Sequence, residues 1–347
     1  MNPAAKSDLY RVAIVGAAGL KGKELAEVLN ARNFPAADIR LLDDDESLGQ
    51  LEAVGEAASF IQAVRAEQFE HVDFAFFASD EAFTRRHWRS AADAGSAVID
   101  LSYALEDEPG VAVRSPWVER ESGNPPRADL ESTSAVIAHP VAVVLALLML
   151  RAAKAAPLER VVAQVFEPVS ERGKAGMDEL HEQTVNLLSF QSMPKTVFDA
   201  QAAFNLLSRY GDKAPVSLEA SEKRIQRHLQ RITAGRAPVP SLMLAQAPIF
   251  HAHICSVYIE LGRELPQADL SRAFAGEHIR LVGAGEEPPN NVNVAGEEDI
   301  LLSVRLDAKR RNAFWLWAAA DNLKLAAITA VDCAAALALT RSKGAVQ

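Results

Sequence analysis

The sequence predicts an α/β fold in which a parallel β-sheet, covered by helices on both faces, precedes a mixed α+β domain. Three observations lead to this class. An apolar run at Tyr10–Val15 is followed by a glycine-rich turn at 16–22 and then by a helical pattern. Strand and helix patterns alternate through the first third of the chain, as they do in parallel sheets. The length of 347 residues suggests two domains of roughly 150 residues each.

In the first domain the elements follow one another as strand, turn and helix. Residues 23–31 predict a helix, because Leu25, Val28 and Leu29 recur at helical spacing. Further strands are expected at 39–42, 74–78 and 97–101. Residues 122–129, rich in Gly, Pro and polar side chains, predict a surface loop.

The second half of the chain predicts longer helices among its strands. Strands are expected at 161–165, 250–261 and 300–306, helices at 177–188 and 219–232, and a loop at 283–294. The Ala- and Leu-rich stretch 322–339 predicts a closing helix.

Charge and hydropathy exclude several classes of protein. A net charge of −10 argues against nucleic-acid binding, which needs a basic face. The longest apolar run, 141–150, is shorter than the roughly 20 residues of a membrane span, so it predicts a buried helix and no membrane partner. No signal peptide is recognised, and two cysteines, Cys255 and Cys333, fit a reducing compartment. We therefore expect a cytoplasmic protein.

The turn after the first strand has the composition of a dinucleotide-binding site. Glycines permit a tight turn and a close backbone approach, and the following helix N-terminus receives a pyrophosphate. An acidic residue at the end of the second strand can accept hydrogen bonds from ribose hydroxyls. The predicted cofactor-binding residues are Gly16, Ala18, Gly19, Leu20, Lys21, Gly22 and Asp43. The alternative is a strand–helix turn that binds no ligand.

Several motifs, in the same order along almost the whole chain, resemble those of aspartate-semialdehyde dehydrogenases. Residues 12–22 resemble the family's Val-Ala-Val-Val-Gly-Ala-Thr-Gly start, and residues 98–105 its Val-Ile-Asp-Asn-Ser-Ser-Ala-Phe segment. Residues 169–176 resemble its Val-Ser-Gly-Ala-Gly segment, and residues 317–323 its Trp-x-x-x-Asp-Asn-Leu motif.

That resemblance implies a domain organisation. A Rossmann-type NAD(P)-binding domain is expected at 1–138 and a mixed α+β dimerisation and substrate domain at 139–318. A C-terminal helix is expected at 319–347, packed back on the first domain. The family forms homodimers through its second domain, so a homodimer is expected here.

At the catalytic positions the sequence departs from the family. Residues 135–144 resemble the loop that opens the catalytic helix, and Ala142 stands where the family has its nucleophilic cysteine. Glu167 stands where a Gln orients the substrate, and Gln246 where an Arg clamps the substrate carboxylate. Only His253 keeps its identity, and we interpret it as a core or cleft histidine rather than a general base.

These replacements predict loss of the family's chemistry, because an alanine methyl cannot attack a carbonyl. Glu106 stands in place of a phosphate-binding Arg, and Ser217 aligns less securely with a basic substrate-domain residue. Glu106 and Glu167 would repel an anionic substrate by on the order of several kcal/mol. Three functions stay open: a nonenzymatic NAD-binding or scaffold protein, an oxidoreductase acting on another aldehyde, and a regulatory partner of an active homologue.

The cofactor itself is predicted from one acidic turn. Residues 44–49, Asp-Asp-Glu-Ser-Leu-Gly, replace the Ser-x-Arg-Ser-x-Gly with which the family holds the 2′-phosphate of NADP. Three acids repel a phosphate, so NAD or no dinucleotide is expected, and NADP is not. A solvated acidic turn is the other interpretation.

Two further arrangements around His253 are conceivable. Cys255 shares a strand face with His253, but neighbours on one strand rarely reach hydrogen-bonding distance, so an inert buried cysteine is the preferred interpretation. His139 and His251 fall in the same region by resemblance, yet four ligands at metal spacing are not evident, and no metal is expected.

Overall fold

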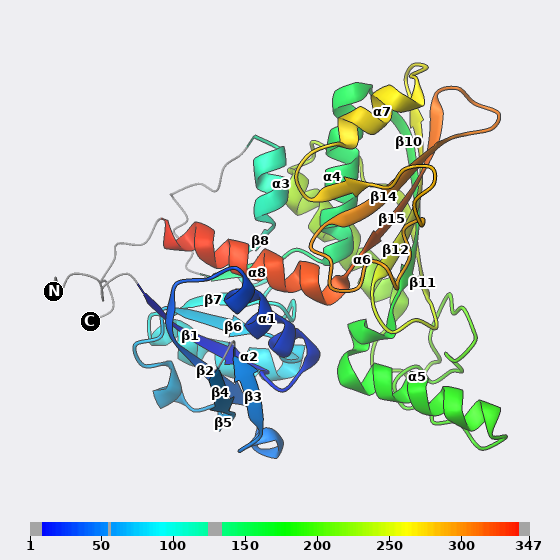
Figure 1. Cartoon of the computed structure of the whole chain (residues 1–347). Helices are drawn as coiled ribbons and strands as arrows, with labels where there is room; N and C mark the ends of the chain where they lie inside the picture. Colours follow the sequence, from blue (N-terminus) through cyan, green and yellow to red (C-terminus); the bar gives the residue numbers. More distant parts are fainter. Residues whose placement is uncertain (1–8, 55–56, 124–133, 340–347) are drawn as a thin grey trace. The chain divides into compact units, whose positions relative to one another are not determined.

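The structure is a computed structural model that describes residues 9–54, 57–123 and 134–339 (Figure 1). The chain divides into two compact units. One contains the residues up to Ala138 together with those from Ala326 onward, and the other spans His139–Leu325. Most of the surface loop predicted at 122–129 lies outside the described residues.

A seven-stranded sheet forms the first unit, and its strand order is β5-β2-β1-β6-β7-β9-β8 (Figure 1). Every neighbouring pair is parallel, as the strand–helix alternation predicts. The strands are β1 (Tyr10–Val15), β2 (Ala36–Asp43), β5 (Gln62–Ala63), β6 (Phe74–Phe77), β7 (Ala97–Asp100), β8 (Ala112–Arg114) and β9 (Ser134–Ile137). Strands β6, β7 and β9 are buried along their whole length, which explains their uninterrupted apolar sequences.

The helices α1 (Leu20–Ala31), α2 (Glu81–Asp93) and α3 (Pro116–Glu121) lie in the same unit. Helix α1 begins at Leu20, three residues before the predicted start, so Gly22 lies in its first turn rather than in the preceding loop. Helix α2 was not predicted from the sequence, although Asp80 caps it by accepting a hydrogen bond from the Phe83 amide. A short hairpin of β3 (Leu51–Val54) and β4 (Ala57–Phe60) completes this part of the chain.

The second unit contains a six-stranded mixed sheet of order β11-β10-β12-β15-β14-β13. Its strands are β10 (Leu158–Glu167), β11 (Ser241–Gln246), β12 (His253–Leu261), β13 (Ile279–Leu281), β14 (Ile300–Leu306) and β15 (Ala313–Ala320). The pairs β10/β11 and β13/β14 are parallel, and the other three are antiparallel. Its helices are α4 (Pro140–Ala155), α5 (Gly173–Leu188), α6 (Leu218–Thr233) and α7 (Gln267–Phe274). Helix α8 (Asn322–Ala338) begins in this unit, and from Ala326 onward it belongs to the first.

Helix α4 accounts for the longest apolar run of the sequence. Every residue from 140 to 152 is buried, and the helix packs against α6 and α7. A helix that is apolar on all sides is stable only inside a protein, so the predicted buried helix is confirmed. Within the described residues, no helix has both the length and the apolar character needed to cross a bilayer.

Strand β12 begins later than the sequence pattern predicts. The prediction placed its start at Phe250, whereas the strand starts at His253. Ala252 has φ +73°, outside the extended region, and its amide donates a hydrogen bond to Asn322 Oδ1. This turn sets the direction from which His253 enters the sheet.

Candidate functional site

The glycine turn of the first unit is shaped by packing at two of its three glycines. Gly16 has φ +87°, and a Cβ there would lie 2.5 Å from the Ser79 amide nitrogen. A Cβ on Gly22 would lie 2.2 Å from the Gly16 carbonyl oxygen. At Gly19 the nearest such atom, again Gly16 O, is 3.3 Å away and φ is −75°. Gly16 and Gly22 are thus required by the fold alone, whereas Gly19 is the glycine that packing explains least.

The end of strand β2 fixes this turn through Asp43. One oxygen of the Asp43 carboxylate accepts from the Ala18 amide at 2.7 Å, and the other accepts from the Asp44 amide at 2.9 Å. A carboxylate offers about four acceptor positions, and these two hydrogen bonds from described residues occupy two of them. Lys21, in contrast, donates to the Leu101 carbonyl at 3.0 Å, and its ammonium lies 4.8 Å from the centre of the Tyr103 ring. Lys21 therefore anchors the turn to the end of β7.

Helix α1 offers an N-terminus without a side-chain cap, since Gly19 is the N-cap residue and the first turn holds no acidic side chain. Such an end attracts an anion. Leu20 is the first residue of the helix. The predicted cofactor residues therefore lie together at one strand–helix junction.

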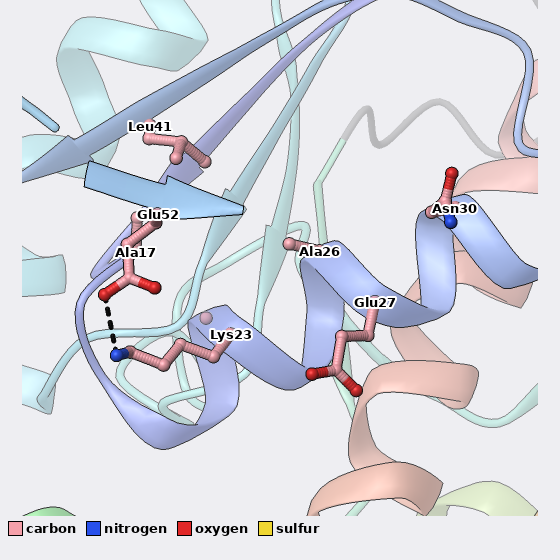
Figure 2. Close-up of a pocket in the computed structure, with 8 residues that line it drawn as sticks. Ala17, Lys23, Ala26, Glu27, Asn30, Leu41 and Glu52 are labelled. Carbon is pink, nitrogen blue, oxygen red and sulfur yellow. Dashed lines mark ion pairs between the residues drawn. The ribbon is translucent and has the colours of Figure 1, made fainter. Parts of the chain in front are cut away.

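Beside this turn lies a pocket of about 330 Å³, whose lining includes Ala17, Ala26 and Leu41 (Figure 2). Its one lining lysine, Lys23, forms an ion pair with Glu52 at 2.6 Å. The predicted acidic turn follows β2 as a short 3-10 segment at Asp45–Ser47 and is exposed at 44–46. The ammonium group of Lys23 in this pocket is thus already paired with a carboxylate.

In the second unit Ala142 lies in the first turn of α4, fully buried. His139 is the N-cap of this helix, and its Nδ1 accepts a hydrogen bond from the Val141 amide at 3.2 Å. The backbone amide of His139 donates to His228 Nδ1 at 3.0 Å. The helix start is therefore fixed by imidazoles, and the side chain at Ala142 is a methyl group.

Glu167 and Gln246 are register partners at the ends of β10 and β11. Both side chains are fully buried. Arg172 Nη2 donates to Glu167 Oε1 and, at 3.0 Å, to Ser221 Oγ. Tyr210 Oη donates to Gln246 Oε1 at 2.7 Å, and Gln246 Nε2 donates to the carbonyls of Glu167 and Ala247, each at 2.8 Å. Gln246 therefore has both ends of its amide engaged within the protein.

This network changes the expected role of Glu167. The sequence predicted that its charge would repel an anionic substrate, but the carboxylate pairs with Arg172. Burial lowers the pKa of Arg172, and the Glu167 carboxylate more than offsets that effect, so the pKa of Arg172 is raised. Burial, together with Glu167, raises the pKa of Tyr210. An unpaired carboxylate at this depth would lose hydration worth several kcal/mol. The ion pair with Arg172 compensates Glu167 for that loss.

His253 starts strand β12 and has 1% of its surface exposed, which agrees with a core histidine. Burial lowers its pKa, so the ring is neutral. Its Nε2 lies 3.9 Å from Glu171 Oε1, and its ring centre lies 5.6 Å from that of His139. One ligand atom from each of His139, Glu171 and His253 lies within 4.8 Å of the others. His251 is not a member of this cluster.

Cys255 follows His253 on the same strand and is buried, with a pKa raised to about 12 by burial. A thiol in this environment is almost entirely protonated at neutral pH.

Ser217 and Glu106 are the two remaining positions at which the sequence departs from the family. Ser217 is the N-cap of α6, and its Oγ accepts from the Ala220 amide at 3.1 Å. Glu106 is buried in the first unit, in the segment that follows β7.

Three residues of the site were not predicted from the sequence: Glu171, Arg172 and Tyr210. The signal for the first two was present, because Glu171-Arg172 stands where the resembling family segment reads Gly-Ala. Tyr210 lies in irregular chain between α5 and α6, where no periodicity points to it.

Comparisons with known proteins agree with this architecture. A family model described as "Semialdehyde dehydrogenase, NAD binding domain" matches residues 11–125, and one described as "Semialdehyde dehydrogenase, dimerisation domain" matches residues 147–325. Aspartate-semialdehyde dehydrogenase of Rickettsia bellii is 28% identical over 340 residues, covering 95% of this chain and 98% of that protein. A protein of Pseudomonas aeruginosa named "USG-1 protein homolog" is 32% identical over 330 residues, covering 94% and 96%.

A solved structure, described as a probable aspartate-semialdehyde dehydrogenase from Pseudomonas aeruginosa, superposes with a TM-score of 0.82. It is 30% identical, and the match covers 95% of this chain and 98% of that one. The first unit is thus an NAD(P)-binding domain of the family and the second contains its dimerisation domain. The chain belongs to the aspartate-semialdehyde dehydrogenase family.

Proposed function

We propose that this protein is a member of the family without its reductive dephosphorylation activity, which retains NAD binding and dimerisation. The observation that carries the proposal is the pair of side chains at two of the family's catalytic positions in the second unit. Ala142 supplies a methyl group at the helix start where the family resemblance places a nucleophile. The amide oxygen and the amide nitrogen of Gln246 are both hydrogen-bonded to other groups of the protein. The nucleophile and the carboxylate clamp are therefore both missing.

No other thiol replaces the nucleophile. Cys255 is buried, and because burial raises its pKa to about 12, its side chain is almost entirely a protonated thiol at pH 7. Cys333 belongs to the other unit, is also buried, and has a pKa raised to about 12 by burial. The sequence holds no third cysteine. A covalent thioester with an aldehyde substrate therefore has no sulfur to form on.

Dinucleotide binding is supported by the first unit. The uncapped start of α1, the glycine at position 19 and the carboxylate of Asp43 suit a pyrophosphate and a ribose. The exposed acids Asp44, Asp45 and Glu46 disfavour a 2′-phosphate, and Lys23 is paired with Glu52. We infer that NAD is the dinucleotide bound.

Dimerisation is supported by an exposed apolar face on the six-stranded sheet. Side chains alternate along β10, so that Ala163 and Val165 are buried while Val162 is 42% exposed. The exposed apolar side chains of the same sheet include Met243, Trp315 and Trp317. Register pairs join them across the sheet, since Val162 faces Tyr258 and Tyr258 faces Trp315. We infer that a second copy of the chain covers this face.

The first prediction concerns activity. The chain should show no phosphate-dependent oxidation of aspartate semialdehyde with NAD or NADP above background, and Ala142→Cys alone should not restore it, because no Arg replaces Gln246 as a clamp. The assay follows reduced dinucleotide by absorbance, with the Rickettsia bellii enzyme as the positive control. Labelling of the A142C variant with iodoacetamide shows whether its new thiol is reachable. Turnover by the unaltered chain, or robust turnover by A142C, would contradict the proposal.

The second prediction concerns the choice of dinucleotide. Calorimetric titration should show that NAD binds at least about tenfold more tightly than NADP, a difference of about 1.4 kcal/mol. Asp45→Arg should strengthen NADP binding and leave NAD binding unchanged, because it places a guanidinium beside the 2′-phosphate. Asp93→Arg on the exposed end of α2 is the matched control and should change neither affinity. Equal or tighter binding of NADP by the unaltered chain, or binding of neither dinucleotide, would disprove the NAD assignment.

The third prediction concerns the dimer. Met243, 50% exposed on β11, should lie in the interface, so Met243→Glu should weaken self-association at least about tenfold by burying an unpaired charge. Phe60→Glu is the control, because Phe60 is 64% exposed on the hairpin of the first unit. Sedimentation velocity over a concentration series measures both. A monomeric unaltered chain, or an equal effect of the two substitutions, rejects this face as the interface.

A further inference from the structure

We propose that His139, Glu171 and His253 form a binding site for a divalent transition-metal ion of the zinc class. The three side chains come from separate places in the second unit: the N-cap of α4, the 3-10 turn at Val169–Arg172 and the first residue of β12. Two imidazoles and one carboxylate are the protein ligands of many zinc centres that leave a coordination position open.

The ligand atoms are already close to the spacing that such an ion requires. All three lie within 4.8 Å of one another, and His253 Nε2 lies 3.9 Å from Glu171 Oε1. Tetrahedral zinc with bonds of about 2.1 Å separates its ligand atoms by about 3.4 Å. Side-chain rotations that bring the atoms inward by roughly an ångström therefore complete the site without a change of fold.

A second, independent observation points to a ligand here. Among the described residues, neither ring nitrogen of His253 has a hydrogen-bond partner, although the side chain is 1% exposed. The other oxygen of the Glu167 carboxylate, Oε2, is likewise buried without a partner in that part of the chain. Buried polar atoms are nearly always hydrogen-bonded or bound to an ion, so unpartnered nitrogens beside a carboxylate mark a place where an ion would be held.

The local charge also favours a cation. The charged groups that act on His253 are the carboxylates of Glu171, Glu167 and Asp321 and the guanidinium of Arg172. Among these groups carboxylates outnumber guanidinium groups three to one, and Arg172 is paired with Glu167. This surrounding favours a divalent cation over an anionic ligand.

Neighbouring groups hold the ligands in place. Asn322 Nδ2 donates to Glu171 Oε1 at 2.9 Å, an outer contact of the kind that orients a metal-bound carboxylate. His139 Nδ1 accepts from the Val141 amide, so coordination through Nε2 requires the ring proton to move to Nδ1 and that hydrogen bond to break. A cap contributes roughly a factor of ten to an equilibrium constant, and metal binding of roughly micromolar affinity outweighs that loss.

The donor set decides the class of ion. Magnesium and calcium prefer sites built from oxygen ligands alone, while two imidazoles select zinc and its neighbours in the first transition series. Bound there, the ion would connect the start of α4 to the first residue of β12.

The test uses the full-length chain without a histidine tag, stripped with a chelator and titrated with Zn²⁺ against a chromophoric zinc indicator. We expect about one ion per chain at roughly micromolar affinity or tighter. His253→Gln, Glu171→Gln and His139→Asn should each weaken binding at least about tenfold, and Asn keeps a cap acceptor for α4. His181→Gln, at an exposed histidine on α5, is the matched control and should leave the affinity unchanged.

Two outcomes overturn the site: no stoichiometric binding by the unaltered chain, or variants that bind as tightly as it does. Circular dichroism checks that each variant is folded. If the buried substitutions prevent folding, Co²⁺ added to the unaltered, stripped chain decides the matter. Intense visible bands typical of tetrahedral Co²⁺, saturating at one equivalent and abolished by Zn²⁺, support the site, and their absence overturns it.

Discussion

The buried ion pair between Glu167 and Arg172 is the interaction on which the site of the second unit depends. Glu167 has 1% of its side chain exposed, and Arg172 has 14%. A lone carboxylate at this depth would destabilise the fold by several kcal/mol, so its presence at the end of β10 requires a buried cation. Arg172 supplies it, and with Tyr210 it links the turn at Val169–Arg172 to Gln246 at the end of β11. The polar groups at these strand ends thus bind one another.

The need to pair the buried carboxylate affects the second unit and leaves the glycine turn of the first unit unchanged. The first unit has the strand–glycine turn–helix junction of a dinucleotide-binding domain. This junction can bind a dinucleotide even if the second unit catalyses no reaction. In the second unit Glu167 and Arg172 pair with each other. The only unpartnered nitrogens among the described site residues belong to His253, beside Glu171. The ring of His253 beside the Glu171 carboxylate is suited to a metal cation. The carboxylate of a small substrate would instead need a free guanidinium.

Much of the fold could be predicted from the sequence, because it rests on periodicity. The uninterrupted apolar run of α4 and the strand–turn–helix start both correspond to observed elements. The site was harder to predict. The sequence marks Glu167 as a departure from the family, but it does not show that the side chain of Arg172, in the turn after β10, folds back onto this carboxylate. The pairing follows from the path of that turn and not from a periodic pattern. The grouping of His139 with Glu171 likewise depends on how the turn after β10 meets α4, which no local pattern records.

A double-mutant cycle on Glu167 and Arg172 tests this account most directly, with the free energy of unfolding measured by urea denaturation. Glu167→Gln should cost about 3–5 kcal/mol, because it leaves the guanidinium buried and unpaired, and adding Arg172→Met should recover a large part of that loss. The exposed pair of Glu219 and Lys223 on α6 provides the control cycle and should show a far smaller coupling. If Glu167→Gln leaves the stability unchanged and the two substitutions are additive, the charges do not compensate each other and the account is wrong.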